Sequence, residues 1–175
     1  MLVHNSHCSY CGTAFTPDSP WPRTCVHCGE TTWVNPLPVA LVMMPVIGAG
    51  GRTGLLMVRR GIEPQLGQLG MPGGFIEEGE SWQQAAVREL WEETGLRADV
   101  DEVELADVLS APRHAILVFG RIKPRPIEEL DGLTPERVLE LSQGETQELV
   151  VIDHAQQLAF PLHTEMAARF FAEPR

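Results

Sequence analysis

The stretch from residue 74 to residue 96 constrains the fold more than any other part of the chain, because its spacing predicts a helix with one acidic face. Glu89, Glu92 and Glu93 stand at positions i, i+3 and i+4. In a helix these three side chains share a face about 100° wide. Three neighbouring carboxylates need a counter-charge, and carboxylate oxygens suit Mg²⁺ or Mn²⁺. A solvated acidic face is the alternative that spacing alone leaves open.

The ends of this helix are also marked in the sequence. Ser81 followed by Gln84 has the form of a capping box, and Gly95 is a natural left-handed terminator. Leu90 and Trp91 fall largely on the side away from the carboxylates. One face can therefore pack against a core while the other faces a site.

A turn sequence, Met-Pro-Gly-Gly at residues 71–74, precedes the predicted helix, and Gly79 adds a second flexible point. Adjacent glycines allow positive φ angles and a close approach of the backbone to a ligand or metal. Arg88 lies inside the acidic cluster and can hold Glu80 or a neighbouring glutamate by bidentate pairing.

Together these residues resemble the signature of a known family, the Nudix box. Its pattern is G-x5-E-x7-R-E-U-x-E-E-x-G-U, where U is aliphatic. The chain matches it at every fixed position: Gly74, Glu80, Arg88, Glu89, Leu90, Glu92, Glu93, Gly95 and Leu96.

The resemblance implies hydrolysis of a nucleoside diphosphate linked to another group, at the pyrophosphate bond and with Mg²⁺ or Mn²⁺. It implies metal ligation by Glu89 and Glu93, with Glu92 as a ligand or helper, and by the backbone carbonyl of Gly73. Divalent metals suit this chemistry because they neutralise phosphate oxygens and activate water.

Further roles follow from the same resemblance. Glu80 and Arg88 are expected to form the pair that orients the cluster. The general base varies within the family, and some members use a carboxylate on a later loop. Glu145 and Glu148, just before the last predicted strand, are the candidates, although ordinary surface charge explains either one equally well.

Four cysteines form the second strong motif. Cys8, Cys11, Cys25 and Cys28 make two CxxC pairs with the spacing of a zinc ribbon. Disulfides are the alternative, but no secretory signal precedes them, which disfavours an oxidising compartment. We therefore expect a closed structural Zn²⁺ site in a ribbon over residues 1–35, followed by a Nudix hydrolase domain over residues 36–175.

The remaining pattern alternates strands and helices. Strands are predicted at residues 38–47, 55–59, 99–107, 115–122 and 149–152, and further helices at residues 135–141 and 163–171. This mixture predicts an α/β fold, a layered α/β/α sandwich with a mixed sheet. The Nudix fold that the box implies has the same layers.

Charge and hydropathy narrow the classes of partner. The formal net charge of −11 disfavours a long nucleic acid, whose backbone requires a basic surface. No apolar run is long enough to span a membrane, so a cytoplasmic protein with a small nucleotide substrate is expected. Many Nudix enzymes form dimers, so a homodimer is also considered.

Substrate identity rests on weaker cues. A zinc ribbon joined to a Nudix domain resembles NADH pyrophosphatases, but residues 107–113 lack the tryptophan-containing signature those enzymes carry after the box. The chain is more similar to ribbon–Nudix proteins that include ADP-ribose and FAD pyrophosphatases. The residues considered for substrate contact are Arg59, Arg60, His114 and Phe160. The alternative is a non-catalytic Nudix module that senses a nucleotide.

Overall fold

The computed structural model describes residues 5–112 and 115–173 of the chain. Within it the chain divides into two compact units, Met1–Pro36 and Leu37–Arg175. The smaller unit holds two short antiparallel strands, β1 (Arg23–Thr24) and β2 (Thr31–Thr32).

The larger unit contains two sheets. The first has the strand order β7-β3-β9-β8, formed by Gly73–Phe75, Leu37–Met43, Ala115–Arg121 and Glu104–Ala111. The second has the order β10-β4-β5-β11, formed by Arg125–Pro126, Pro45–Ile47, Thr53–Arg60 and Thr146–Ile152, and β6 (Leu69–Gly70) also pairs with β5. The pairs β3–β9 and β4–β10 are parallel and the others antiparallel, so the predicted mixed pairing is confirmed.

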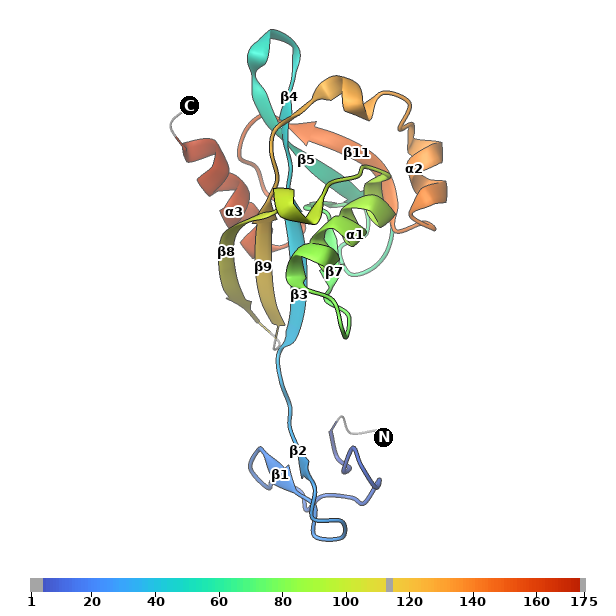
Figure 1. Cartoon of the computed structure of the whole chain (residues 1–175), viewed down its shortest axis with the longest axis vertical. Coiled ribbons are helices and arrows are strands. Elements are labelled where there is room, and N and C mark those ends of the chain that lie inside the picture. The colour runs from blue at the N-terminus through green and yellow to red at the C-terminus, as the bar shows by residue number, and fades with distance from the viewer. Residues whose placement is uncertain (1–4, 113–114, 174–175) are drawn as a thin grey trace. The chain divides into compact units, whose positions relative to one another are not determined.

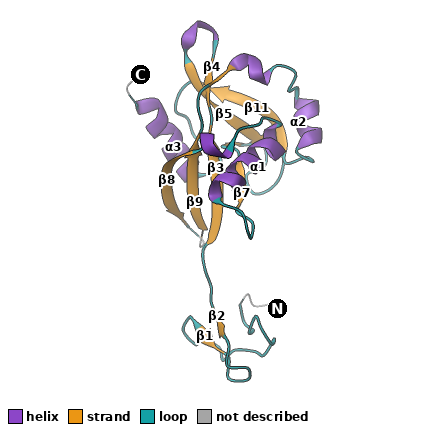
Figure 2. Cartoon of the chain, viewed as in Figure 1, coloured by secondary structure: helices purple, strands orange, loops and turns teal. Residues whose placement is uncertain are grey.

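Among the described residues, three α-helices and three short 3-10 helices complete the larger unit (Figures 1 and 2). The α-helices are α1 (Trp82–Thr94), α2 (Pro135–Leu141) and α3 (Pro161–Ala172). The 3-10 helices are η1 (Ala49–Gly51), η2 (Val100–Glu102) and η3 (Ile127–Leu130).

The two faces of the sheets form separate cores. Alternate residues of β3 point to opposite faces, as a strand requires. Leu41 and Met43 pack in a cluster with Met166 and Phe170 of α3. Ala40 and Val42, which alternate with them along β3, pack in a second cluster with Ala85, Ala86 and Leu90 of α1. Helices therefore cover both faces (Figure 1), and the predicted α/β/α sandwich is confirmed.

Sequence patterns located most elements but missed some boundaries. The predicted strand at 38–47 is two strands separated at Met44. The predicted strand at 99–107 starts only at Glu104, because residues 100–102 form the 3-10 turn η2. In the described part of the chain, no helix has the length and apolar character needed to cross a membrane.

Candidate functional site

Helix α1 begins and ends where its caps predict. The Ser81 side chain accepts a hydrogen bond from the Gln84 backbone N–H at 3.2 Å, and the Gln84 side chain accepts from the Ser81 N–H at 2.7 Å. Gly95 closes the helix with φ of 77°, and its N–H donates to the Trp91 carbonyl at 2.8 Å. Because both ends are defined, the carboxylates in between have a fixed register.

Glu93 is a buried carboxylate at the centre of the site. The residue is 8% exposed, and Oε2 accepts a hydrogen bond from the Gly73 backbone N–H at 2.9 Å. Burial raises the pKa of Glu93 to about 8, and the nearby charges of Glu89 and Glu145 act in the same direction. A cation placed here would favour the ionised form that burial opposes.

Glu89 lies against the glycine turn that precedes the helix. A Cβ added to Gly74 would fall 2.6 Å from the Glu89 carboxyl carbon, and one added to Gly73 would fall 2.7 Å from the Leu41 Cα. Gly73 also has φ of 146°. Neither position can hold a side chain, so these glycines let the turn approach both β3 and the carboxylates. Burial raises the pKa of Glu89 as well, opposed by Arg88.

Arg88 holds the acidic cluster together. Its guanidinium donates to Glu80 at 2.6 and 3.2 Å, to Glu89 at 2.8 Å and to Glu92 at 3.0 Å. It also donates to the Phe75 carbonyl at 3.0 Å. The paired Arg88 lowers the pKa of Glu80, which keeps that carboxylate ionised. The expected pairing of Glu80 with Arg88 is thus present in the structure, and Glu92 is held by the same guanidinium.

The two candidate general bases occupy different environments. Glu148 of β11 forms an ion pair with Arg59 of β5 at 2.6 Å, directly across the two strands. Glu145 lies near the helix carboxylates, since its charge raises the pKa of both Glu89 and Glu93. Glu145 therefore acts electrostatically on the buried acidic cluster, whereas Glu148 is paired with Arg59.

The residues considered for substrate contact have different partners in the structure. Arg59 is occupied by Glu148 and donates to the Gly67 carbonyl. The Arg60 guanidinium lies over the Phe160 ring, 5.2 Å from its centroid. The two form one cation–π contact. His114 lies outside the described residues.

His163 of α3 is a residue that the sequence analysis did not single out for the site. It is 5% exposed, and its Nδ1 accepts a hydrogen bond from the Met71 backbone N–H at 3.1 Å. Burial, helped by the charge of Arg60, lowers the pKa of His163 to about 4, so the imidazole is neutral. No sequence signal links His163 to residue 71, because the contact joins positions 92 residues apart.

The donor set around the box suits a hard divalent cation, since every candidate ligand is oxygen. Within the described ranges, however, the glutamates are not drawn into one compact group of ligand atoms; only the four cysteines are. Arg88 forms ion pairs with the Glu89 and Glu92 carboxylates, while Glu93 accepts a hydrogen bond from the Gly73 N–H. Glu89, Glu93 and the Gly73 carbonyl are the groups that would hold a metal here.

The four cysteines converge in the smaller unit. The sulfurs of Cys8 and Cys28 are 3.7 Å apart and those of Cys11 and Cys25 are 3.6 Å apart, and all four lie within 4.8 Å of one another. These separations exceed an S–S bond of about 2.05 Å. They match the edge of about 3.8 Å that a tetrahedron with Zn–S bonds of about 2.3 Å requires. All four are free thiols, so the clustering favours a metal over disulfides.

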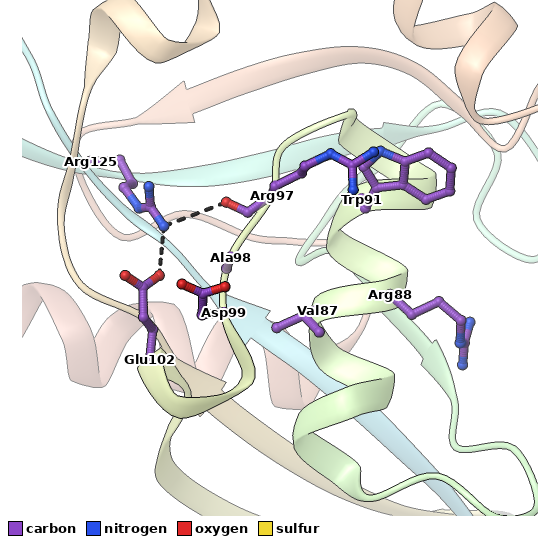
Figure 3. Close-up of a pocket in the computed structure, with 8 residues that line it drawn as sticks. All are labelled: Val87, Arg88, Trp91, Arg97, Ala98, Asp99, Glu102 and Arg125. Atoms are coloured by element: carbon purple, nitrogen blue, oxygen red, sulfur yellow. Dashed lines mark hydrogen bonds and ion pairs between the residues drawn. The ribbon is translucent and has the colours of Figure 1, made fainter.

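A cavity of about 500 Å³ lies on a different face of α1 from Glu89 and Glu93. Figure 3 shows Arg97 beside the Trp91 ring, and Arg125 directed toward Glu102 and the Arg97 carbonyl. Of the acidic cluster only Arg88 reaches its lining. This cavity is therefore not the carboxylate site.

An α/β/α sandwich with a capped carboxylate helix behind a glycine turn defines the Nudix class of proteins. A family model for the NUDIX domain matches residues 36–163. The chain belongs to this family, and the prediction of a Nudix hydrolase is confirmed at that level.

Named relatives agree with this assignment. The chain is 30% identical over 97 residues to the NAD-capped RNA hydrolase NudC of Salmonella heidelberg, covering 54% of this chain and 35% of that protein. It is 41% identical over 64 residues to an RNA pyrophosphohydrolase of Cereibacter sphaeroides, covering 35% of this chain and 40% of that protein. The chain thus spans well under half the length of these curated relatives.

A solved structure supports the fold. A NUDIX hydrolase from Nitrosomonas europaea superposes with a TM-score of 0.59 at 22% identity, covering 95% of this chain and 90% of that one. Two relatives are named for RNA substrates, so the expectation that nucleic acid is not a partner is not confirmed.

Proposed function

We propose that this protein is a divalent-metal-dependent pyrophosphohydrolase acting on a nucleoside diphosphate linked to another group. The substrates belong to the class of ADP-ribose, FAD and NAD(H), and one product is AMP or another nucleoside monophosphate. The observation that carries the proposal is the buried Glu93, which bonds to the glycine turn beside Glu89.

The physical reason is electrostatic. An acidic site repels a pyrophosphate, so it can act on one only when a cation is present. Bound Mg²⁺ or Mn²⁺ supplies charge neutralisation of the phosphate oxygens and a water of lowered pKa. We assign ligation to Glu89, Glu93 and the Gly73 carbonyl. Arg88 holds Glu89 in place, and it is itself fixed by Glu80.

The reaction requires a proton acceptor. A water oxygen forms a bond to one phosphorus atom, the bridging P–O bond breaks, and the bridging oxygen leaves with the second phosphate. We assign the acceptance of the water proton to Glu145, because it is the later-loop carboxylate close to Glu89 and Glu93. Glu148 is engaged by Arg59.

Substrate contact is assigned to the Arg60–Phe160 pair, whose cation and ring suit a phosphate and a base respectively. The names of the curated relatives add a nucleotide cap on RNA to the substrates worth testing. ADP-ribose, FAD, NADH, CoA, dinucleoside polyphosphates and NAD-capped RNA should be compared with Mg²⁺ or Mn²⁺, with products identified by mass spectrometry.

The decisive variant is Glu93→Gln. We expect it to remain folded and to lose at least about 10²-fold in turnover, because it removes a charged metal ligand. Glu78→Gln is the control for removal of a glutamate charge, since Glu78 is exposed in the loop that precedes α1. Wild-type turnover in Glu93→Gln would overturn the assignment.

The competing function is a nucleotide-sensing module without catalysis. It predicts nucleotide binding with no release of AMP in the presence of Mg²⁺. The retention of every box carboxylate favours the enzyme.

We propose structural Zn²⁺ at the four cysteines, on the basis of their clustered sulfurs. Four thiolates leave no open coordination position, so this ion has no part in the reaction.

A further inference from the structure

Residues 71 and 72 connect the two sheets, because β6 pairs with β5 and β7 pairs with β3. The Pro72 carbonyl accepts a hydrogen bond from the Val42 N–H at 2.8 Å. Gly73, which begins β7, follows directly and carries the carbonyl assigned to the metal. The position of this short segment therefore sets the position of one proposed ligand.

Two buried side chains hold the segment from opposite faces. Glu93 of α1 accepts from the Gly73 N–H at 2.9 Å, and His163 of α3 accepts from the Met71 N–H at 3.1 Å. Among the described residues, these are the only buried Asp, Glu, His, Lys or Arg side chains. Helices α1 and α3 lie on the two sides of the sheets (Figure 1), so the segment is clamped between the layers.

The His163 ring is itself held firmly. It packs edge-on against Phe119, with ring centroids 6.2 Å apart, and at a tilt against Phe160, with ring centroids 5.1 Å apart. A Cβ at Gly70 would lie 3.6 Å from Nδ1, an ordinary van der Waals distance, so β6 runs beside the ring. An apolar residue would fill the same space, but it would leave the Met71 N–H without its acceptor, at a cost for a buried group.

We propose that His163 is a positioning residue that acts through the Met71 N–H to place the Gly73 carbonyl for the catalytic divalent metal. The inference rests on the proposed function, because it takes Gly73 as a ligand. It assigns to α3, outside the box, a part in metal affinity. Outer-shell hydrogen bonds to metal ligands commonly have such effects.

The test compares variants of His163 that differ in where the side chain places a hydrogen-bond acceptor for the Met71 N–H. Asparagine places an oxygen near the site of Nδ1, glutamine places it farther out, and leucine has none. We expect His163→Leu to weaken Mn²⁺ binding about tenfold, measured by the EPR signal of free Mn²⁺ without nucleotide. We expect His163→Asn to restore most of the affinity and His163→Gln to restore less.

A second readout follows the hydrogen bond without added divalent metal. Amide exchange at Met71 should accelerate in His163→Leu and be slowed again in His163→Asn. Met166→Ala is the matched control, because Met166 is buried in the same helix and cluster. It should lower thermal stability with unchanged Mn²⁺ affinity.

The two proposals fail in different ways. Equal Mn²⁺ affinity in wild type and His163→Leu would overturn the positioning role. If His163→Leu does not fold, the comparison is between His163→Asn and His163→Gln, and equal Mn²⁺ affinity in these two variants would overturn it. Absence of nucleotide hydrolysis by a wild type that binds Mn²⁺ would overturn the proposed function and leave the Mn²⁺ comparison intact.

Discussion

Glu93 differs from an ordinary surface carboxylate because its buried environment disfavours the ionised form. Burial raises its pKa to about 8, and the Gly73 N–H only partly offsets that effect. The ionised form is therefore costly in the protein without bound divalent metal. A bound metal would offset this cost, so the stability of the fold should depend on whether the metal site is occupied.

The first prediction concerns pH. The folded-state pKa of Glu93 lies above the ordinary value, so this group is neutral in both states below about pH 4 and destabilises the fold increasingly up to about pH 8. Glu93→Gln should therefore raise the free energy of unfolding at pH 9 by several kcal/mol, without added Mg²⁺ or Mn²⁺. Urea unfolding at pH 5 and pH 9 measures this. A gain of the same size at both pH values would contradict it.

The second prediction separates the two candidate bases. Glu145→Gln should lower kcat about 100-fold or more with little change in KM, because it removes the proposed proton acceptor. Glu148→Gln should lower kcat far less, since it removes only a partly exposed pair with Arg59. Steady-state kinetics at saturating Mg²⁺ decide between them. A larger loss in Glu148→Gln would reverse the assignment.

Sequence spacing could predict the part of the site that lies on one helix. Glu89 and Glu93 share a face in the structure because both belong to α1, whose caps are local. The Arg59–Glu148 pair and the His163–Met71 bond could not be predicted, because strand register and helix packing create them. Local patterns do not encode contacts of this range.

At the scale of elements, α1 is the helix whose ends matter most. Its capping box connects Ser81 and Gln84 in both directions, just after the loop that carries Glu80. A frayed first turn would loosen the chain between Glu80 and its partner Arg88.

The third prediction tests this cap. Ser81→Ala should lower the free energy of unfolding by about 1 kcal/mol, the usual effect of losing a serine cap. Ser110→Ala, at an exposed position of β8, is the control and should change little. Thermal denaturation of both variants measures the difference, and equal melting temperatures would show that the cap does not stabilise the helix.

Elements with strong local patterns were predictable and those made by pairing were not. The sequence prediction of a helix at 135–141 coincides with α2, which has Thr134 as its cap and Pro135 in its first turn. Strands β6 and β7 lie in a glycine-rich stretch that predicts a turn. They are strands only because β5 and β3 supply hydrogen-bonding partners.

The whole molecule combines two units stabilised by different means. The unit Leu37–Arg175 has two apolar clusters, in which Leu90, Phe119 and similar side chains are fully buried. In the described part of the other unit, the buried residues are Cys8, Cys25 and Thr32, whereas Tyr10, Val26 and Trp33 are exposed. Residues 5–36 of the smaller unit therefore show no apolar core, and four metal–thiolate bonds are expected to supply the stability of this unit.

The fourth prediction follows from this difference. Purified protein should retain about one zinc per chain, and a strong chelator should unfold the unit Met1–Pro36 while Leu37–Arg175 stays folded. All four cysteines lie in the smaller unit, so thiol-reactive dye should label them rapidly only after chelation. Hydrogen exchange measured on peptides should rise in the smaller unit and remain unchanged in α1 and α3. Unaltered exchange over residues 5–36 after complete zinc removal would contradict the prediction, because it would mean that the ribbon is stable without its metal.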